Sequence, residues 1–289
     1  MGRQRADAQE GGRAAVDQDL EHHYSHLAET YDATWGHRPD YLDWMEAQIS
    51  SRLELRPGDW IADIGAGTGL FLRRLLEYAT EETPLVCVDP SQPMLDRLPA
   101  DPRLFPVRAR AEDLARGALN DDRTLPRDAF NAIVIKEAVH HFSDLSGTLA
   151  GLAGHLVPGG RILIVTLPPK IDYPLFRRAL ARFADNQPDP EDIETALRDA
   201  GLEARTSYAE FPVSVDRDHW LHLVQGRWMS VLSSFSDAEL ADGLDEIAET
   251  AEPRRDGRLE FPDRFAFIEG RAPIAGRAPI AGGAGTADR

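Results

Sequence analysis

The chain has 289 residues, of which 42% are hydrophobic and 28% are charged, and its formal net charge is −17 at pH 7. This composition is typical of a globular protein with a sizeable core, and no apolar run is long enough to cross a bilayer. The negative charge argues against nucleic acid and anionic membrane surfaces as partners, because both are bound through Lys and Arg contacts to phosphate.

The two ends of the chain differ in composition from its middle. Residues 1–19 have few large apolar side chains and no apolar run of a secretory signal, so we expect a disordered tail on a cytoplasmic protein. Residues 270–289 contain a hexapeptide, GRAPIA, that occurs twice in tandem. Two copies are too few for a repeat fold, so a second disordered tail is expected. The folded body is therefore predicted over 20–269.

The chain has one cysteine, Cys87, which excludes an internal disulfide and a cysteine-based structural zinc site. It lies in an apolar run, so we expect a small buried side chain rather than a reactive thiol. No metal site is predicted from the sequence.

Helical and strand-like segments alternate along the folded body. Short apolar strands separated by helices indicate a parallel sheet that is covered on both faces, which is a doubly wound α/β fold. The expected strands are 60–64, 85–88, 104–110, 131–135, 161–167, 203–213 and 258–268. The expected helices are 20–34, 39–54, 70–78, 93–98, 145–156 and 190–200, followed by a helical insert over 214–250 with a capping box at Ser236 and Glu239.

A glycine-rich segment, Asp-Ile-Gly-Ala-Gly-Thr-Gly over 63–69, follows the first expected strand and precedes a helix. Glycines there let the backbone turn tightly and approach a ligand that a side chain would exclude. The helix N-terminus would lie at the carboxyl edge of the sheet, where such folds bind nucleotides. The next strand ends at Asp89, in position to meet a ribose hydroxyl.

The spacing of these glycines separates two classes of ligand. A dinucleotide fingerprint reads G-x-G-x-x-G, whereas this segment reads G-x-G-x-G and begins with Asp63. A carboxylate at that point would repel a pyrophosphate but suits a ligand with a sulfonium and an ammonium group. A nicotinamide-dependent oxidoreductase is therefore the less favoured alternative.

Five motifs occur in one order over about residues 24–167. They are 63–69, Asp89-Pro90-Ser91, Ala111-Glu112-Asp113, the segment 130–137 with His140-His141, and Leu-Val-Pro-Gly-Gly-Arg-Ile-Leu-Ile over 156–164. In this order they resemble the class I S-adenosylmethionine-dependent methyltransferases, particularly the small-molecule group that includes ubiquinone/menaquinone-type enzymes. The resemblance implies a Rossmann-like, seven-stranded, mostly parallel sheet whose last strand is antiparallel. It also implies N-terminal lid helices over 20–55 and a substrate cap formed by the insert 214–250.

The resemblance also implies S-adenosylmethionine as cofactor, with S-adenosylhomocysteine as product. Asp63 would lie near the cofactor's amino group and Asp89 would hold its ribose hydroxyls. Glu112 or Asp113 would meet the adenine amino group, and Lys136 would offer its backbone rather than its charged side chain. The remaining implied cofactor residues are Gly65, Ala66, Gly67, Gly69, Pro90, Met94, Ala111, Tyr24 and Tyr31.

Three candidate catalytic residues follow the fourth expected strand, at the edge where the transferred methyl group should emerge. They are Glu137, His140 and His141. A base is needed only if the nucleophile must lose a proton, and histidine suits that task because its pKa lies near neutral. The alternative is that one histidine packs against the sheet while the other faces solvent.

The expected function is therefore methyl transfer to an oxygen, nitrogen or carbon atom of a small-molecule acceptor. Two alternatives stay open. One is a member of the fold that binds the cofactor without methylating, and the other is the oxidoreductase above. In the insert, Trp220 is expected to be a core residue, while an exposed Arg227 facing the cleft would indicate an anionic substrate. The acceptor, the methylated atom and the oligomeric state stay open.

Overall fold

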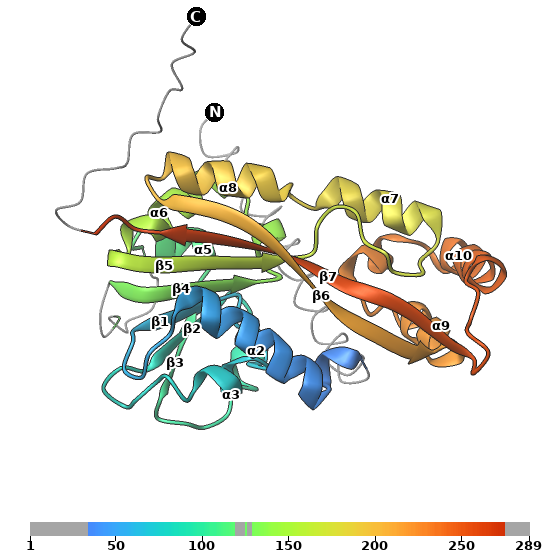
Figure 1. Ribbon diagram of the computed structural model, residues 1–289, viewed down its shortest axis with the longest axis horizontal. Helices are drawn as coiled ribbons and strands as arrows, with labels where there is room; N and C mark the ends of the chain where they lie inside the picture. The colour runs from blue at the N-terminus through green and yellow to red at the C-terminus, as the bar shows by residue number, and fades with distance from the viewer. Residues whose placement is uncertain (1–33, 119–124, 126–128, 275–289) are drawn as a thin grey trace, which may run out of the picture.

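Seven strands form one sheet in the computed structural model, which describes residues 34–118, 125 and 129–274 (Figure 1). The strand order is β3-β2-β1-β4-β5-β7-β6, and only β7 runs antiparallel to its neighbours. The strands are β1 (Ile61–Ile64), β2 (Leu85–Asp89), β3 (Leu104–Arg108), β4 (Phe130–Lys136), β5 (Leu156–Thr166), β6 (Glu203–Asp216) and β7 (Arg258–Arg271). The doubly wound, mostly parallel sheet is therefore confirmed. The order reverses between β1 and β4, which is where such sheets open a ligand crevice at the carboxyl ends of their strands.

Helices cover both faces of the sheet because its central strands are buried on both sides. Residues of β1 alternate between two hydrophobic clusters, with Ile61 on one face and Ala62 and Ile64 on the other. The first face packs against α2 (Pro39–Leu53), α3 (Leu72–Leu75), α7 (Arg177–Asn186), α9 (Arg217–Gln225) and α10 (Asp237–Thr250). The second face packs against α5 (Ala111–Ala115), α6 (Leu145–Gly154) and α8 (Pro190–Asp199), and α4 (Gln92–Leu95) follows β2.

The helix α2 confirms the helix expected over 39–54, while its role as a lid stays a prediction. Its buried side chains recur every fourth residue, at Tyr41, Met45, Ile49 and Leu53, so one stripe faces the core. Pro39 opens the helix at a position where its missing N–H costs no hydrogen bond. The first expected lid helix, with Tyr24 and Tyr31, lies outside the described residues.

The strands β6 and β7 form a ribbon that continues beyond the rest of the sheet. They pair along their whole length, from Glu203 opposite Arg271 to Asp216 opposite Arg258. The strand β5 pairs with β7 only from Ala266 onward. The far half of the ribbon carries the insert, in which α9, η3 (Ser230–Ser234) and α10 pack against α7 and the ribbon (Figure 1). Ser236 and Glu239 form the expected capping box at the start of α10.

Two local expectations differ from the structure. The helix expected over 70–78 is a single turn, Leu72–Leu75, flanked by bonds such as Arg74 N–H to Phe71 O and Tyr78 N–H to Leu75 O that span three residues. Such tight turns do not propagate into a long α-helix. The helix α7 was not expected, although Phe176, Ala179 and Phe183 follow a helical spacing and are all buried.

Cys87 is completely buried in β2, which confirms the expectation of a small core side chain. No helix in the described ranges combines the length and the apolar composition needed to cross a bilayer. The strand β7 extends to Arg271, so the first copy of the hexapeptide begins inside the sheet.

Candidate functional site

The glycine loop follows β1 and is fastened to the neighbouring strand. The N–H groups of Gly65 and Ala66 both donate to Val88 O, at 2.8 and 3.1 Å. Gly65 has φ +80°, and a Cβ there would lie 2.4 Å from the Cβ of Ala138. Gly67 has φ +54°, but a Cβ there would meet nothing within 4 Å. Gly65 therefore permits close packing inside the protein, whereas Gly67 borders open space in which a ligand could approach the backbone.

Asp89 ends β2 and is tied to the glycine loop. Its Oδ2 accepts a hydrogen bond from Gly67 N–H at 2.9 Å, and its Oδ1 accepts one from Ser91 N–H at 2.8 Å. Burial raises the pKa of Asp89, and the two backbone hydrogen bonds oppose that rise. Each oxygen keeps a second lone pair, so the carboxylate can still accept hydrogen bonds from ligand hydroxyls.

Asp63 lies one strand away on the same face of the sheet. Burial raises its pKa to about 7, the negative charge of Asp89 adds to the rise, and the ammonium of Lys136 opposes it. Within 34–118, 125 and 129–274, no donor forms a hydrogen bond or ion pair with the Asp63 carboxylate. A buried carboxylate without a partner is costly, so this position favours a cationic ligand.

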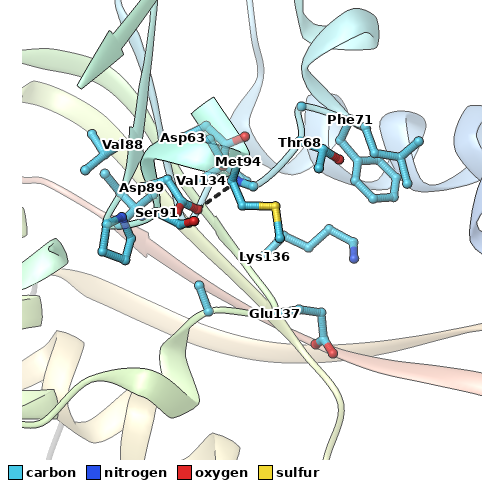
Figure 2. A pocket seen from close by; sticks show the side chains of 18 of the residues that line it. Asp63, Thr68, Phe71, Val88, Asp89, Ser91, Met94, Val134, Lys136 and Glu137 are labelled. Carbon is cyan, nitrogen blue, oxygen red and sulfur yellow. Dashed lines mark hydrogen bonds between the residues drawn. The ribbon is translucent and has the colours of Figure 1, made fainter. Parts of the chain in front are cut away.

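The cleft beside these residues encloses about 1760 Å³. That exceeds the usual volume of a site for one small ligand, so there is room for a cofactor and a second small molecule. Figure 2 shows Asp89 and Met94 on one side of it and Phe71 on the other. All of the expected cofactor residues within the described ranges line this cleft: Asp63, Gly65, Ala66, Gly67, Gly69, Asp89, Pro90, Met94, Ala111, Glu112, Asp113 and Lys136.

Glu112 and Asp113 open α5 and have different partners. Glu112 Oε1 accepts hydrogen bonds from the N–H and the hydroxyl of Ser143, both at 2.9 Å. Burial opposes ionisation of Glu112, but these hydrogen bonds outweigh it and lower its pKa. Asp113 pairs with Arg116 at 2.8 Å and accepts from the N–H of Arg110, which caps the helix. Glu112 thus lies more deeply in the wall of the cleft than Asp113.

Glu137 directly follows β4 in a left-handed conformation with φ 53°, which is uncommon for a residue other than glycine. Its N–H donates to Val165 O at 2.8 Å, and its Oε1 accepts from Leu167 N–H at 2.9 Å. Burial raises its pKa, and the nearby Lys136 opposes the rise. These bonds join the ends of β4 and β5, so a structural role for Glu137 is evident while its catalytic role stays a prediction.

His140 and His141 lie in the 3-10 turn η2 (Val139–His141), and both line the cleft. Their ring centroids are 4.1 Å apart. Burial lowers the pKa of His140 to about 4, and its Nδ1 has no hydrogen-bond partner. His141 is exposed. His140 is therefore neutral at pH 7, and its Nδ1 is buried without a partner.

Lys136 is the last residue of β4, and its side chain contacts aromatic rings. Its Nζ lies 4.5 Å from the ring centroid of Phe71 and 5.5 Å from that of Phe265. Burial lowers the pKa of Lys136, while the charges of Glu137, Asp263 and Asp63 oppose that shift.

The sequence analysis missed a buried polar pair beyond Lys136. The Tyr173 hydroxyl donates a short hydrogen bond to Asp263 Oδ1, and both side chains are buried. Asp263 lies on β7 between the inward-facing Phe261 and Phe265. An acid that interrupts an alternating aromatic face is the signal that could have revealed it.

The insert does not supply an exposed cation to the cleft. The guanidinium of Arg227 donates to Leu232 O and Phe235 O at 2.6 and 2.7 Å and pairs with Asp237 at 2.7 Å. The condition for an anionic substrate, an exposed Arg227 facing the cleft, is therefore not met, because the turn after α9 binds the side chain. Trp220 is completely buried and donates to Pro174 O at 2.8 Å, which confirms its core role.

The described part of the chain contains no cluster of three or more His, Cys, Asp or Glu side chains arranged to hold a metal ion.

Comparison with known proteins finds a similarity to methyltransferases. Residues 62–162 match a family model described as a methyltransferase domain. An uncharacterized methyltransferase of Mycobacterium tuberculosis is 31% identical over 106 residues, which is 37% of this chain and 49% of the relative. The chain thus spans about half the length of the first curated relatives it matches.

Two further matches extend beyond that domain. The ubiquinone/menaquinone biosynthesis C-methyltransferase UbiE of Vibrio parahaemolyticus is 26% identical over 184 residues, covering 53% of this chain and 68% of the relative. A solved structure from Anabaena variabilis, named as a candidate methyltransferase from an antibiotic biosynthesis pathway, has a TM-score of 0.58 and 19% identity. It covers 78% of this chain and 96% of its own, and its likeness shows the fold. Residues 62–162 thus match a methyltransferase domain, and the chain is similar to methyltransferases over a longer stretch.

Proposed function

We propose that the chain transfers a methyl group from S-adenosylmethionine to an oxygen, nitrogen or carbon atom of a small-molecule acceptor. The observation that carries this proposal is the buried Asp63 carboxylate, which lines the cleft beside the glycine loop and has no hydrogen bond within the described residues. Such a carboxylate favours a ligand with ammonium and sulfonium groups. It disfavours the pyrophosphate of a nicotinamide dinucleotide, which the oxidoreductase alternative would require.

The residues around the cleft fit the parts of this cofactor. Asp63 would hold the amino group, Asp89 the ribose hydroxyls, and Glu112 or Asp113 the adenine amino group. Gly67 leaves room for a ligand against the loop backbone. When bound, the cofactor supplies an electrophilic methyl carbon whose bond to sulfur breaks as its bond to the acceptor nucleophile forms. The chain's own contribution is mainly to hold the nucleophile in line with that carbon. This positioning lowers the activation free energy of methyl transfer.

A proton must leave when the nucleophile is a neutral hydroxyl, a protonated amine or a carbon atom that bears hydrogen. His140 lines the cleft and is neutral at pH 7, so its imidazole is the first candidate to accept that proton. Its lowered pKa makes it a weak base, which suits a transfer that occurs together with methylation rather than before it. His141 and Glu137 are the other candidates.

A small metabolite is the acceptor class that these observations favour. The net charge of −17 opposes nucleic acid, and the relative UbiE is named for quinone biosynthesis. The cleft volume leaves space beside a cofactor for a second small molecule.

The test begins with calorimetric titration of S-adenosylhomocysteine and, separately, of NADH. The proposal expects binding of the first and no binding of the second, and the reverse result would contradict it. A screen of small molecules with methyl-labelled S-adenosylmethionine then looks for a labelled product. Cofactor binding together with an acceptor that is converted without receiving the label would support the non-methylating alternative instead.

A further inference from the structure

We infer that the Lys136 ammonium is the recognition group of the acceptor subsite, and that the acceptor is an acid whose carboxylate pairs with it beside an apolar body. This inference rests on the proposed function, because it assigns the second molecule in the same cleft. The sequence analysis assigned the backbone of Lys136 to the cofactor, whereas this inference concerns its side chain.

The position of Lys136 follows from strand alternation. Ala132 and Val134 of β4 belong to the hydrophobic cluster on the α2 face of the sheet, so Lys136, two residues later, points to that face as well. Asp63 of β1 pairs in register with Val134 and lies on the same face. The strand order then places β5 and β7 on the side of β4 away from β1.

The ammonium extends toward Phe71 and β7, within electrostatic range of Asp63. Its Nζ lies 4.5 Å from the Phe71 ring centroid and 5.5 Å from that of Phe265, which belongs to β7. Figure 2 shows the side chain extending away from Asp89 toward Phe71. A carboxylate at Nζ would therefore belong to a molecule bound beside Phe71, which lines the cleft, whereas the Phe265 ring is buried and does not line it.

The ammonium has no acceptor of its own. Across 34–118, 125 and 129–274, no hydrogen bond or ion pair to Lys136 is present, and its contacts with the protein are the two rings and longer-range charges. The nearby acids have other partners, since Glu137 accepts from Leu167 N–H and Asp263 accepts from the Tyr173 hydroxyl. Because Lys136 lines the cleft, its ammonium has N–H donors that a ligand in the cleft could use.

The choice of lysine here is unusual for this chain. Lys136 and Lys170 are its two lysines among 32 basic residues, and the rest are arginines. Two arginines that line the cleft are engaged: Arg74 pairs with Asp43 at 2.7 Å and Arg108 donates to Pro90 O at 3.3 Å. A desolvated ammonium on aromatic faces gains more from an anion than a solvated arginine does, because water competes less.

The test measures binding of matched acids and amides to protein saturated with S-adenosylhomocysteine. The probes are benzoate, 2-naphthoate and decanoate, each paired with its primary amide, and binding is followed by ligand-observed NMR. We expect the wild type to prefer the acid in at least one pair. Lys136→Met should lower the affinity for that acid about tenfold or more and leave the affinity for its amide unchanged. The substitution removes a charge-assisted hydrogen bond that only the acid forms. Lys136→Arg should restore much of the preference.

Lys170→Met is the matched control, because it removes the same charge from an exposed position that does not line the cleft. It should bind every probe as the wild type does. Equal affinity of the wild type and Lys136→Met for all three acids, or no acid preference in any pair, would overturn the inference.

A second arm separates an acceptor carboxylate from that of the cofactor. S-adenosylhomocysteine and 5′-methylthioadenosine, which lacks the amino-acid part, are titrated into the wild type and Lys136→Met. The inference expects the substitution to leave both affinities nearly unchanged. A loss confined to S-adenosylhomocysteine would assign Lys136 to the cofactor and overturn the acceptor subsite. Failure of the wild type to bind S-adenosylhomocysteine would contradict the proposed function instead, and the acid preference can still be measured without it.

Discussion

The Asp89 carboxylate and the Gly67 amide are joined by a hydrogen bond of 2.9 Å, which ties the end of β2 to the loop after β1. The residue proposed to hold the cofactor ribose therefore also sets the position of the loop against which the cofactor would lie. Asp89→Ala removes the negative charge and both backbone hydrogen bonds. We expect its affinity for S-adenosylhomocysteine to fall about tenfold or more by calorimetry. Asp96→Asn, in an exposed carboxylate outside the cleft, is the control, and unchanged affinity in Asp89→Ala would refute the ribose assignment.

Two glycines of one loop should respond differently to the same substitution. Gly65→Ala places a Cβ 2.4 Å from that of Ala138 at φ +80°, so we expect a loss of about 2 kcal/mol or more in the free energy of unfolding. Gly67→Ala meets no neighbour, so it should cost only about 1 kcal/mol for its left-handed backbone. The methyl group of Gly67→Ala would point into open space, however, and should lower the affinity for S-adenosylhomocysteine. Chemical denaturation and calorimetry measure the two effects, and tight binding by folded Gly67→Ala would mean that no ligand approaches this backbone.

Cofactor binding should release a proton from Asp63. Its pKa of about 7 means that much of it is protonated at pH 6.5, and a cationic ligand beside it favours the ionised form. The pKa must then fall on binding, so a proton passes to the buffer. Calorimetry at pH 6.5 in phosphate and in Tris should give binding enthalpies that differ by the buffers' ionisation heats. The difference should shrink at pH 8.5 and vanish in Asp63→Asn, and its persistence in that variant would assign the proton to another group.

Glu137→Gln distinguishes a structural carboxylate from a catalytic one. The amide oxygen of glutamine can accept the Leu167 N–H bond in place of Glu137 Oε1, so the junction between β4 and β5 should survive. If the side chain only fastens these strands, turnover of an acceptor found in the labelled screen should stay near that of the wild type. A large fall in kcat with unchanged melting temperature would instead make Glu137 a base. Glu137→Ala, which loses the hydrogen bond, should be less stable than either.

The histidine pair is tested by replacing each ring in turn. If His140 accepts the acceptor's proton, His140→Ala should lower kcat about 100-fold, within the usual contribution of a general base. Its S-adenosylhomocysteine affinity should stay near that of the wild type. Because burial lowers the His140 pKa to about 4, its ionisation should not appear in a pH–rate profile between pH 6 and 8. Full activity in both His140→Ala and His141→Ala would remove the base hypothesis.

The spacing of residues within single segments predicted the parts of the site that lie at the ends of strands. The glycine loop, Asp63 and Asp89 lie at strand ends, and their positions follow once β1 and β2 are recognised as short apolar runs. The stripe of α2 was equally readable, because Tyr41 and Met45 recur at helical spacing.

The rest depends on contacts between segments far apart in the chain. The partners of Lys136 come from the loop after β1 and from β7, and periodicity in β4 says nothing about either. The same holds for Tyr173 and Asp263, which are 90 residues apart. The acceptors of Arg227 lie nearer, in the turn that follows α9, but hydrogen bonds from a side chain to backbone carbonyls leave no periodic pattern in the sequence.

The place of β7 between β5 and β6 has a consequence for synthesis of the chain. When β5 and β6 have left the ribosome, neither can pair with the other, because the strand that lies between them is still to be made. Both present unpaired edges during that interval, and such edges invite association with other chains. Phe265, whose ring lies near the Lys136 ammonium, is made with β7 as well. The nascent protein therefore has its glycine loop and both strand-end carboxylates before Lys136 gains this neighbour. A chaperone that shields sheet edges would act in that interval.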